Sequence, residues 1–279
     1  MEIFRRVIEL REGINKRGFS LGLVPTMGFL HRGHLSLVQA ARTQNANVAV
    51  SIFVNPKQFG PDDDLEDYPR DLIRDIAVLE AEGVDLVWTP VIGEVYPSGY
   101  QTYVSVEQIT RGLEGARRPS HMRGVTTVVA KLLIAFKPDS AYFGQKDAQQ
   151  VCAVRRMVSD LGFPVRVVVC PTVREPDGLA LSSRNTYLKS DQRQASTVLF
   201  RALSAAHTAY AEGQRNGDKL RALIEDVIAS EPLAVVQYVS VADSDTLEEL
   251  QCLPEQALAS LAVRIGEAVL IDNMLLGET

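Results

Sequence analysis

The chain has 279 residues, of which 46% are hydrophobic and 23% charged, and its formal net charge at pH 7 is −6. This length favours one large and one smaller domain, and the composition is typical of a globular protein with a substantial core. The negative charge argues against non-specific nucleic-acid binding, and no apolar stretch reaches the length of a membrane span. Three widely spaced cysteines predict buried free thiols and a cytoplasmic protein.

The first predicted elements are a helix over residues 1–18 and a short buried strand after it. A turn follows, in which Gly28 and Gly33 would let a phosphate or a flat ring approach the backbone. This turn also carries His31 and His34, half of the four histidines, at the start of a helix. Free backbone N–H groups at the helix start would favour an anion. Two alternatives stay open, because the histidines could simply cap the helix or bind a metal.

An unbroken apolar run predicts a strand over residues 47–54, followed by a loop with Asn55 and Gln58. Loops at the carboxyl ends of parallel strands line the ligand crevice, so these amides should lie across from the histidine turn. A plain Asn-Pro turn is the alternative. The acidic loop over 61–64 could recruit a cation or be a solvated run of charge.

An amphipathic helix is predicted over residues 68–82, and Asp71, Arg74 and Asp75 are assigned to its solvent face. A third strand is predicted over 85–88.

The long segment 89–120 is rich in loops, with a strand expected over 103–106, and such connections often form binding flaps. The segment 117–124 is basic and precedes a predicted helix over 125–136. Positive charge beside a helix start suits a polyphosphate, although a soluble surface also explains it.

A short strand over 140–143 leads into a second turn that opens a helix. Here Lys146 would bring an ammonium group to phosphates, and Gln150 would point down the same helix face one turn later. A further parallel strand is predicted over 163–170.

The polar loop over 181–185 contains Ser182, Ser183 and Arg184. Their hydroxyls and guanidinium would suit a triphosphate. The alternative is that these residues form an ordinary turn. After this loop we expect two long helices and two strands, over residues 190–212, 218–230, 235–241 and 262–274. The alternation of strands and helices predicts a doubly wound parallel α/β sheet in a first domain, 1–172. The change of pattern after it predicts a smaller α+β domain, 173–279.

Several strings in this sequence together resemble the pantothenate synthetase (pantoate–β-alanine ligase) family. They are Pro25-Thr26-Met27-Gly28 with His31-x-Gly33-His34, Ser51 to Phe59, Tyr68-Pro69-Arg70, His121-x-Arg123-Gly124-Val125, Phe143-Gly144-x-Lys146-Asp147-x-Gln149-Gln150, and Pro171 to Glu175 with Leu179-Ala180-x-Ser182-Ser183-Arg184-Asn185. The strings follow the family's order and span nearly all of residues 20–190. The last hundred residues match mainly in length and general pattern.

The resemblance implies ATP-dependent condensation of pantoate with β-alanine to pantothenate, through a pantoyl adenylate, with release of AMP and pyrophosphate. It implies a Rossmann-like fold of the adenylate-forming and nucleotidyltransferase type, in which 1–172 binds nucleotide and pantoate and 173–279 acts as a lid. A homodimer and Mg²⁺ bridging the ATP phosphates are also expected, with no nucleic-acid or membrane partner and no metal ligands identified.

The resemblance also implies roles for individual residues. The residues expected to take part in catalysis are His31, His34, Lys146, Ser182, Ser183 and Arg184. Those expected to contact ATP are Met27, Gly28, Gly33, His34, Gly144, Gln145, Lys146, Asp147, Val173, Leu181, Ser182, Ser183 and Arg184. Those expected to bind pantoate are Asn55, Gln58 and Gln150. Two positions depart from the family pattern, Gln145 where glutamate is common and Leu181 where methionine is common.

Two other functions are compatible with the same architecture. A nucleotidyltransferase would join AMP to a phosphorylated acceptor and release no free AMP. A non-catalytic adenine-nucleotide sensor would bind ATP without releasing pyrophosphate.

Overall fold

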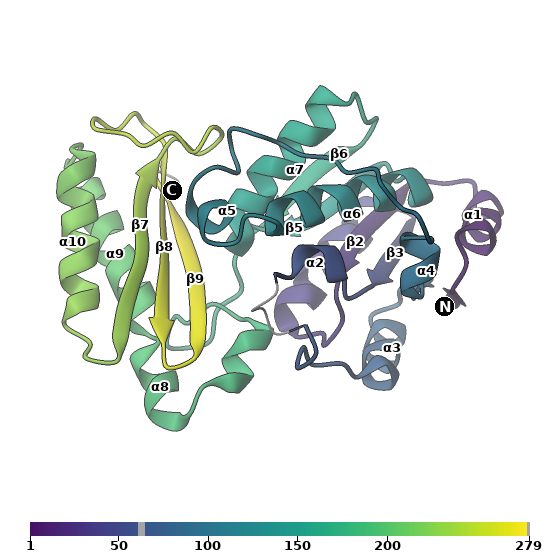
Figure 1. Cartoon of the computed structure of the whole chain (residues 1–279), viewed down its shortest axis with the longest axis horizontal. Helices are drawn as coiled ribbons and strands as arrows, with labels where there is room; N and C mark the ends of the chain where they lie inside the picture. Colours follow the sequence, from purple (N-terminus) through teal and green to yellow (C-terminus); the bar gives the residue numbers. More distant parts are fainter. Residues whose placement is uncertain (61–64, 278–279) are drawn as a thin grey trace. The chain divides into compact units, whose positions relative to one another are not determined.

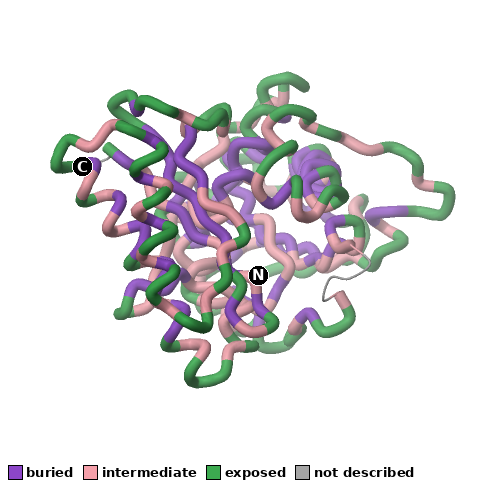
Figure 2. Tube along the Cα trace, turned by 60° about the vertical axis from the view of Figure 1, so that its left-hand side comes forward, coloured by how far each residue is buried: buried purple, intermediate pink, exposed green. Residues whose placement is uncertain are grey.

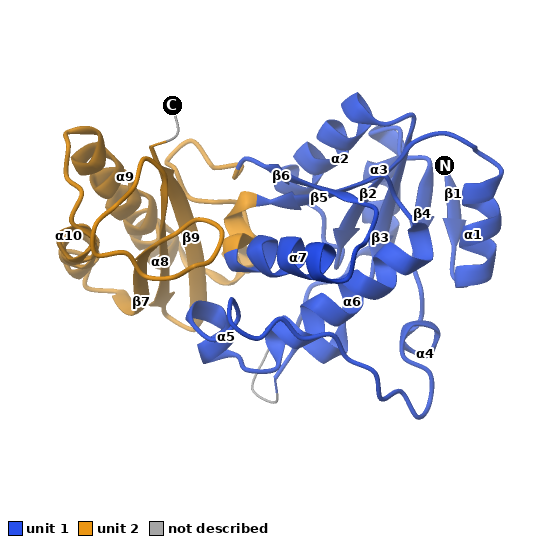
Figure 3. Ribbon diagram, turned by 90° about the horizontal axis from the view of Figure 1, so that it is seen from above, with its two compact units in different colours: residues 1–144, 149–171 blue, residues 145–148, 172–279 orange. Residues whose placement is uncertain are grey.

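The computed structural model describes residues 1–60 and 65–277, which form two compact units (Figure 3). Unit 1 comprises residues 1–144 and 149–171, and unit 2 comprises residues 145–148 and 172–279. The acidic loop predicted at 61–64 lies outside the described residues. The lid role expected for the second domain stays a prediction.

Within the described residues, unit 1 contains a parallel sheet of six strands in the order β1-β4-β3-β2-β5-β6. The strands are β1 (Glu2–Phe4), β2 (Leu21–Thr26), β3 (Asn47–Ile52), β4 (Leu86–Trp88), β5 (Ser140–Gly144) and β6 (Arg166–Cys170) (Figure 1). From β2 the chain builds outward to β3 and β4, and later adds β5 and β6 on the other side. The strand order therefore reverses between β2 and β5, and the predicted doubly wound parallel sheet is confirmed.

Helices cover both faces of this sheet. The helices of this part of the chain are α1 (Val7–Asn15), α2 (Arg32–Gln44), α3 (Leu72–Ala81), α4 (Ile92–Val95), α5 (Leu113–Arg117), α6 (His121–Phe136) and α7 (Ala148–Asp160), with a 3-10 turn η1 (Pro56–Gln58). Successive strand residues face opposite sides. Leu23 packs in one core with residues of α1, α6 and α7, whereas Val24 packs in another with residues of α2 and α3. Figure 2 shows how buried, intermediate and exposed segments alternate along the chain.

Three expectations for unit 1 were wrong. Residues 1–18 begin with strand β1 rather than helix, because Glu2–Phe4 pairs with β4 in parallel. The helix predicted from residue 68 starts only at Leu72, where the Asp71 side chain accepts a hydrogen bond from the N–H of Arg74. The strand expected over 103–106 is absent from the described residues. The backbone of Val104 is hydrogen-bonded to side chains of α6 instead of to a strand, because its N–H donates to the Thr127 hydroxyl and its C=O accepts from the Thr126 hydroxyl.

Unit 2 combines an antiparallel sheet with two packed helices, so the expected smaller α+β part is confirmed. Its described strands pair in the order β7-β8-β9. The elements are η2 (Gln145–Asp147), η3 (Ser183–Tyr187), α8 (Ser190–Ala195), α9 (Val198–Ala211), α10 (Gly217–Ala229), β7 (Ala234–Ala242), β8 (Ala257–Ile265) and β9 (Ala268–Leu276). Side chains from α9, α10 and the sheet form one apolar core.

Two predicted elements of unit 2 are each divided in the structure. The strand expected over 262–274 covers parts of both β8 and β9, which form a hairpin around Gly266 with its φ of 59°. The helix expected over 190–212 is interrupted between α8 and α9. There the Ser196 and Thr197 hydroxyls donate to the carbonyls of Arg193 and Gln194 and compete with the helical pattern.

The cysteine prediction is also partly wrong. Cys152 and Cys170 are buried free thiols as expected, but Cys252 is exposed. Burial raises the pKa of the Cys170 thiol.

Candidate active site

The histidine turn, residues 27–34, connects the carboxyl end of β2 to the start of α2. Gly28 has a φ of 84°, and a Cβ at this position would lie 2.9 Å from an oxygen of Asp75. Phe29 also has a left-handed backbone, with a φ of 51°. This tight conformation explains why the turn requires a glycine directly after Met27.

The two histidines form a reciprocal cap at the start of α2. His31 Nδ1 accepts the N–H of Gly33 at 3.1 Å, and His34 Nδ1 accepts the N–H of His31 at 3.3 Å. The ring centroids are 4.1 Å apart. A neutral imidazole whose Nδ1 accepts a hydrogen bond carries its proton on Nε2. Each ring therefore has an Nε2–H donor.

This cap changes the expected origin of the anion site. The N–H of Gly33 is bonded to His31, and the N–H of His34 is bonded to the His31 carbonyl. These two amides are already paired, so they do not supply the free backbone N–H groups that the anion-site prediction expected at this helix start. The capping alternative is correct as well, and it is what orients the two rings.

Asp75 fixes the outer part of the histidine turn. Its side chain is 1% exposed and accepts the N–H of Phe29 at 2.7 Å and that of Leu30 at 2.8 Å. The assignment of Asp75 to the solvent face of its helix was wrong. Arg74, the neighbouring residue, lies 3.9 Å from the same carboxylate and stacks over the Phe29 ring.

The carboxyl end of β3 contributes Asn55 and Gln58. Gln58 Nε2 lies 3.1 Å from Met27 Sδ, so this loop meets the histidine turn as expected. Asn55 is 1% exposed, and its amide is saturated. Its oxygen accepts from Tyr96 and from the N–H of Lys57, while its nitrogen donates to Gln58 Oε1 and to the Gly124 carbonyl.

The saturated Asn55 amide has no capacity left for a substrate, and it fixes the Gln58 side chain instead. Burial raises the pKa of Tyr96, which keeps its hydroxyl protonated as a donor to Asn55. The approach of α6 to this loop requires Gly124, because a Cβ there would lie 2.2 Å from the Lys57 carbonyl oxygen.

The basic segment 117–124 is engaged within unit 1. Arg117 pairs with Glu114 at 2.8 Å, and Arg123 stacks over Tyr103 at 4.5 Å from the ring centroid. His121 Nδ1 lies 2.9 Å from the Gln58 carbonyl oxygen. The His121 contact ties the start of α6 to the Gln58 loop.

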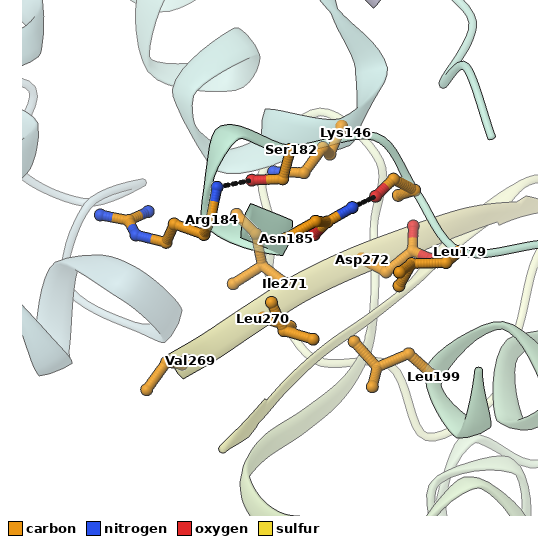
Figure 4. Close-up of a pocket in the computed structure, with 11 residues that line it drawn as sticks. Lys146, Leu179, Ser182, Arg184, Asn185, Leu199, Val269, Leu270, Ile271 and Asp272 are labelled. Atoms are coloured by element: carbon orange, nitrogen blue, oxygen red, sulfur yellow. Dashed lines mark hydrogen bonds between the residues drawn. The ribbon is translucent and has the colours of Figure 1, made fainter. Parts of the chain in front are cut away.

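Unit 2 brings Lys146 together with Ser182 and Arg184 of the polar loop 182–184 at one small cavity (Figure 4). Lys146, Ser182 and Arg184 line it together with apolar residues of β9. Ser182 Oγ accepts the N–H of Arg184 at 3.3 Å, whereas the Arg184 guanidinium extends away from the cavity in Figure 4. Lys146 also lies 3.5 Å from Asp147.

Asp272 also lines this cavity, and its carboxylate is buried. Both of its oxygens bind the Arg174 guanidinium, at 2.6 and 3.0 Å. Burial raises the pKa of Asp272, and the guanidinium opposes that shift. Val173 and Leu181, two expected ATP contacts, are joined by a hydrogen bond from the Leu181 N–H to the Val173 carbonyl.

The structure thus divides the expected site residues between the two units. Those in unit 1 are Met27, Gly28, His31, Gly33, His34, Asn55, Gln58, Gly144 and Gln150. Those in unit 2 are Gln145, Lys146, Asp147, Val173, Leu181, Ser182, Ser183 and Arg184.

Two wider properties concern the described residues, 1–60 and 65–277. This part of the chain contains no group of three or more His, Cys, Asp or Glu side chains that could hold a metal ion. It also has no helix long and apolar enough to cross a membrane.

Comparisons with known proteins agree on one family. A family model described as pantoate-beta-alanine ligase matches residues 2–275. A pantothenate synthetase from Roseiflexus sp. (strain RS-1) is 58% identical over 276 residues, which are 99% of each chain.

Solved structures give the same result. A pantothenate synthetase from Thermus thermophilus has a TM-score of 0.95 and 47% identity, covering 98% of this chain and 99% of that one. A pantoate-beta-alanine ligase from Francisella tularensis, complexed with beta-gamma ATP and beta-alanine, has a TM-score of 0.82 and 35% identity, covering 100% of this chain and 98% of that one.

Proposed function

The chain belongs to the pantoate–β-alanine ligase family, and on that premise we propose how its residues carry out the ATP-dependent ligation of pantoate with β-alanine. The reaction forms pantothenate through a pantoyl adenylate and releases AMP and pyrophosphate. The observation that supports the proposal is the capped histidine pair, whose rings are held at the start of α2 in the same turn that contacts Gln58 through Met27.

In the first step a pantoate carboxylate oxygen bonds to the α-phosphorus of ATP, and the bond from this phosphorus to the bridging oxygen breaks. Pyrophosphate leaves with the electron pair. Because two anions must meet, the barrier is largely electrostatic and positional. His31 and His34 donate to oxygens that gain charge at the α-phosphoryl group, and Lys146 stabilises the leaving pyrophosphate.

The polar loop 182–184 supplies hydroxyls and a guanidinium to the phosphates. Gln58 and Gln150 orient pantoate with neutral amides. Unlike a cationic side chain, these amides form no ion pair that would lower the nucleophilicity of the pantoate carboxylate. Asn55 acts on pantoate through Gln58, because its own amide is fully bonded. The remaining contacts proposed for ATP are Met27, Gly28, Gly33, Gly144, Gln145, Asp147, Val173 and Leu181.

In the second step the amine of β-alanine attacks the carbonyl carbon of the adenylate, loses a proton and displaces AMP. Water must be excluded while the adenylate exists. We assign this to closure of the second domain, residues 173–279. Mg²⁺ fits this chain best as the counterion that enters on the ATP phosphates, since a phosphate-bound Mg²⁺ needs few protein ligands. A cytoplasmic homodimer completes the proposal.

The experiment is pyrophosphate–ATP exchange with pantoate alone, followed by AMP and pantothenate release once β-alanine is added. His34→Ala should lower the exchange rate by about 10²-fold. His207→Ala, a change of a histidine on α9 that is not among the expected site residues, should keep the wild-type rate. Wild-type exchange in His34→Ala would refute the assignment of the histidine.

The same assay separates the alternatives. AMP retained in the product, with none released, would favour a nucleotidyltransferase. ATP binding without pyrophosphate release would favour a nucleotide sensor.

A further inference from the structure

Strand β9 carries a buried asparagine that holds the Lys146 turn. Asn273 is 4% exposed, and its side-chain nitrogen donates to the carbonyls of Gln145 and Lys146, each at 2.9 Å. Its side-chain oxygen accepts from Gln145 Nε2 at 3.0 Å. One amide thus makes three hydrogen bonds to η2, a turn 127 residues away from it in the sequence.

Asn273 is itself held in place by an ion pair. Its backbone N–H donates to Asp272 at 2.8 Å, and its carbonyl accepts from Arg174 at 3.3 Å. Arg174 and Asp272 form the bidentate pair described above. Arg174 belongs to one of the strings that resemble the ligase family, and the reaction itself gives it no role. Its contacts make it the anchor of Asn273.

Two successive carbonyls held by one amide fix the orientation of two peptide planes. The Cα of Lys146 lies between these planes. We call the two hydrogen bonds from the Asn273 amide the Asn273 fork, and this fork fixes the point from which the lysine side chain starts. A lysine ammonium is a mobile point charge on a flexible stem, and its position depends on where that stem begins. A displacement of about 1 Å at a reacting group costs about 10²-fold in rate.

We propose that Asn273 is a positioning residue for adenylation, which holds the Lys146 turn in place beside the polar loop 182–184. The inference rests on the proposed role of Lys146 in that step. It also explains why residues 145–148 belong to unit 2, although the sequence on both sides of them belongs to unit 1.

Asn273→Asp tests the inference with almost no change in volume. An ionised carboxylate has no donor for the two carbonyls and turns an oxygen toward them. We expect the pyrophosphate–ATP exchange rate with pantoate to fall by about 10²-fold. The pantoate KM should stay unchanged, because Gln58 and Gln150 lie in unit 1. Asn273→Ala removes the same hydrogen bonds without adding charge. If the aspartate variant does not fold, the exchange rate of this alanine variant tests the inference.

Asn216→Ala is the matched control. Asn216 caps α10 in the same unit by accepting the N–H of Lys219 at 2.9 Å. Its removal should destabilise the helix start without touching the Lys146 turn. This variant should melt at a lower temperature but exchange pyrophosphate at the wild-type rate.

A double-mutant cycle separates positioning from simple stabilisation. In a Lys146→Ala background, Asn273→Ala should cause little further loss of exchange, because the group that it positions is already gone. If the losses of exchange rate in the two single variants instead multiply in the double variant, the inference is overturned. Exchange at the wild-type rate in both Asn273 variants would overturn it as well. No exchange in the wild-type protein would instead overturn the proposed function, and with it the inference.

Discussion

Replacing Asp75 by asparagine should damage both the stability and the activity of the protein. The carboxylate accepts two backbone hydrogen bonds from the histidine turn, at 2.7 and 2.8 Å, and is 1% exposed. An asparagine keeps one acceptor and points an NH₂ group at the other N–H. One buried donor then loses its partner in a turn where Phe29 already has a φ of 51°.

The magnitude follows from that lost partner. An unsatisfied buried donor costs about 1–3 kcal/mol, so we expect Asp75→Asn to lower the free energy of unfolding by about 2 kcal/mol. At about 2–4 °C per kcal/mol for a chain of this size, the melting temperature should fall by about 4–8 °C. Because this turn also carries His31 and His34, the rate of pyrophosphate–ATP exchange should fall by about 10-fold or more.

The assay is thermal unfolding combined with the exchange reaction, and Asp71→Asn is the control. Asp71 is an exposed N-cap on the same helix, and asparagine caps as well as aspartate does. The control should therefore stay within about 0.5 kcal/mol of wild type and keep its exchange rate. An Asp75→Asn protein that melts and exchanges like the Asp71 control would refute the anchoring role.

Gln150→Ala should raise the pantoate KM by about 10-fold, as for the loss of one hydrogen bond, and leave the ATP KM nearly unchanged. A change in the ATP KM alone would place Gln150 at the nucleotide instead. The N–H groups of Thr246 and Asp245 hold the pKa of Asp243 below its ordinary value, so ionised Asp243 stabilises the fold above about pH 4. That contribution is lost as the pH falls through the lowered pKa. Unfolding of Asp243→Asn and wild type should thus differ more at neutral pH than near pH 2, and an equal difference at both would contradict this reasoning.

The elements predicted correctly are those whose signal is local. The parallel sheet follows from apolar runs such as β3, which is buried on both faces and therefore lacks alternation. Strand β1 has only three residues and exists because β4 pairs with it, so no local pattern could reveal it. The hairpin of β8 and β9 is predicted as one strand because both strands are apolar, and Gly266 at its turn is the local signal that separates them.

In the candidate site, too, only residues with a local signal in the sequence could be predicted. The histidine turn could be recognised because two histidines and two glycines lie within a few residues. Asp75 could not, because its position on α3 also fits a solvent face and its partners lie 45 and 46 residues away. Asn273 had one visible signal: an aspartate and an asparagine follow each other inside an apolar strand, where a buried polar pair needs partners.

The grouping of residues 145–148 with unit 2 bears on how the chemistry is organised. Along the sequence this segment looks like the start of α7, in the first domain, and its lysine would then be assigned to the same body as the histidines. The Asn273 fork instead ties it to β9. Lys146 therefore keeps its place relative to Ser182 in whatever position unit 2 takes, since both line one cavity within that unit. If the second domain closes as we propose, Lys146 and Ser182 would move as one set, separately from the glutamines that we propose for pantoate in unit 1.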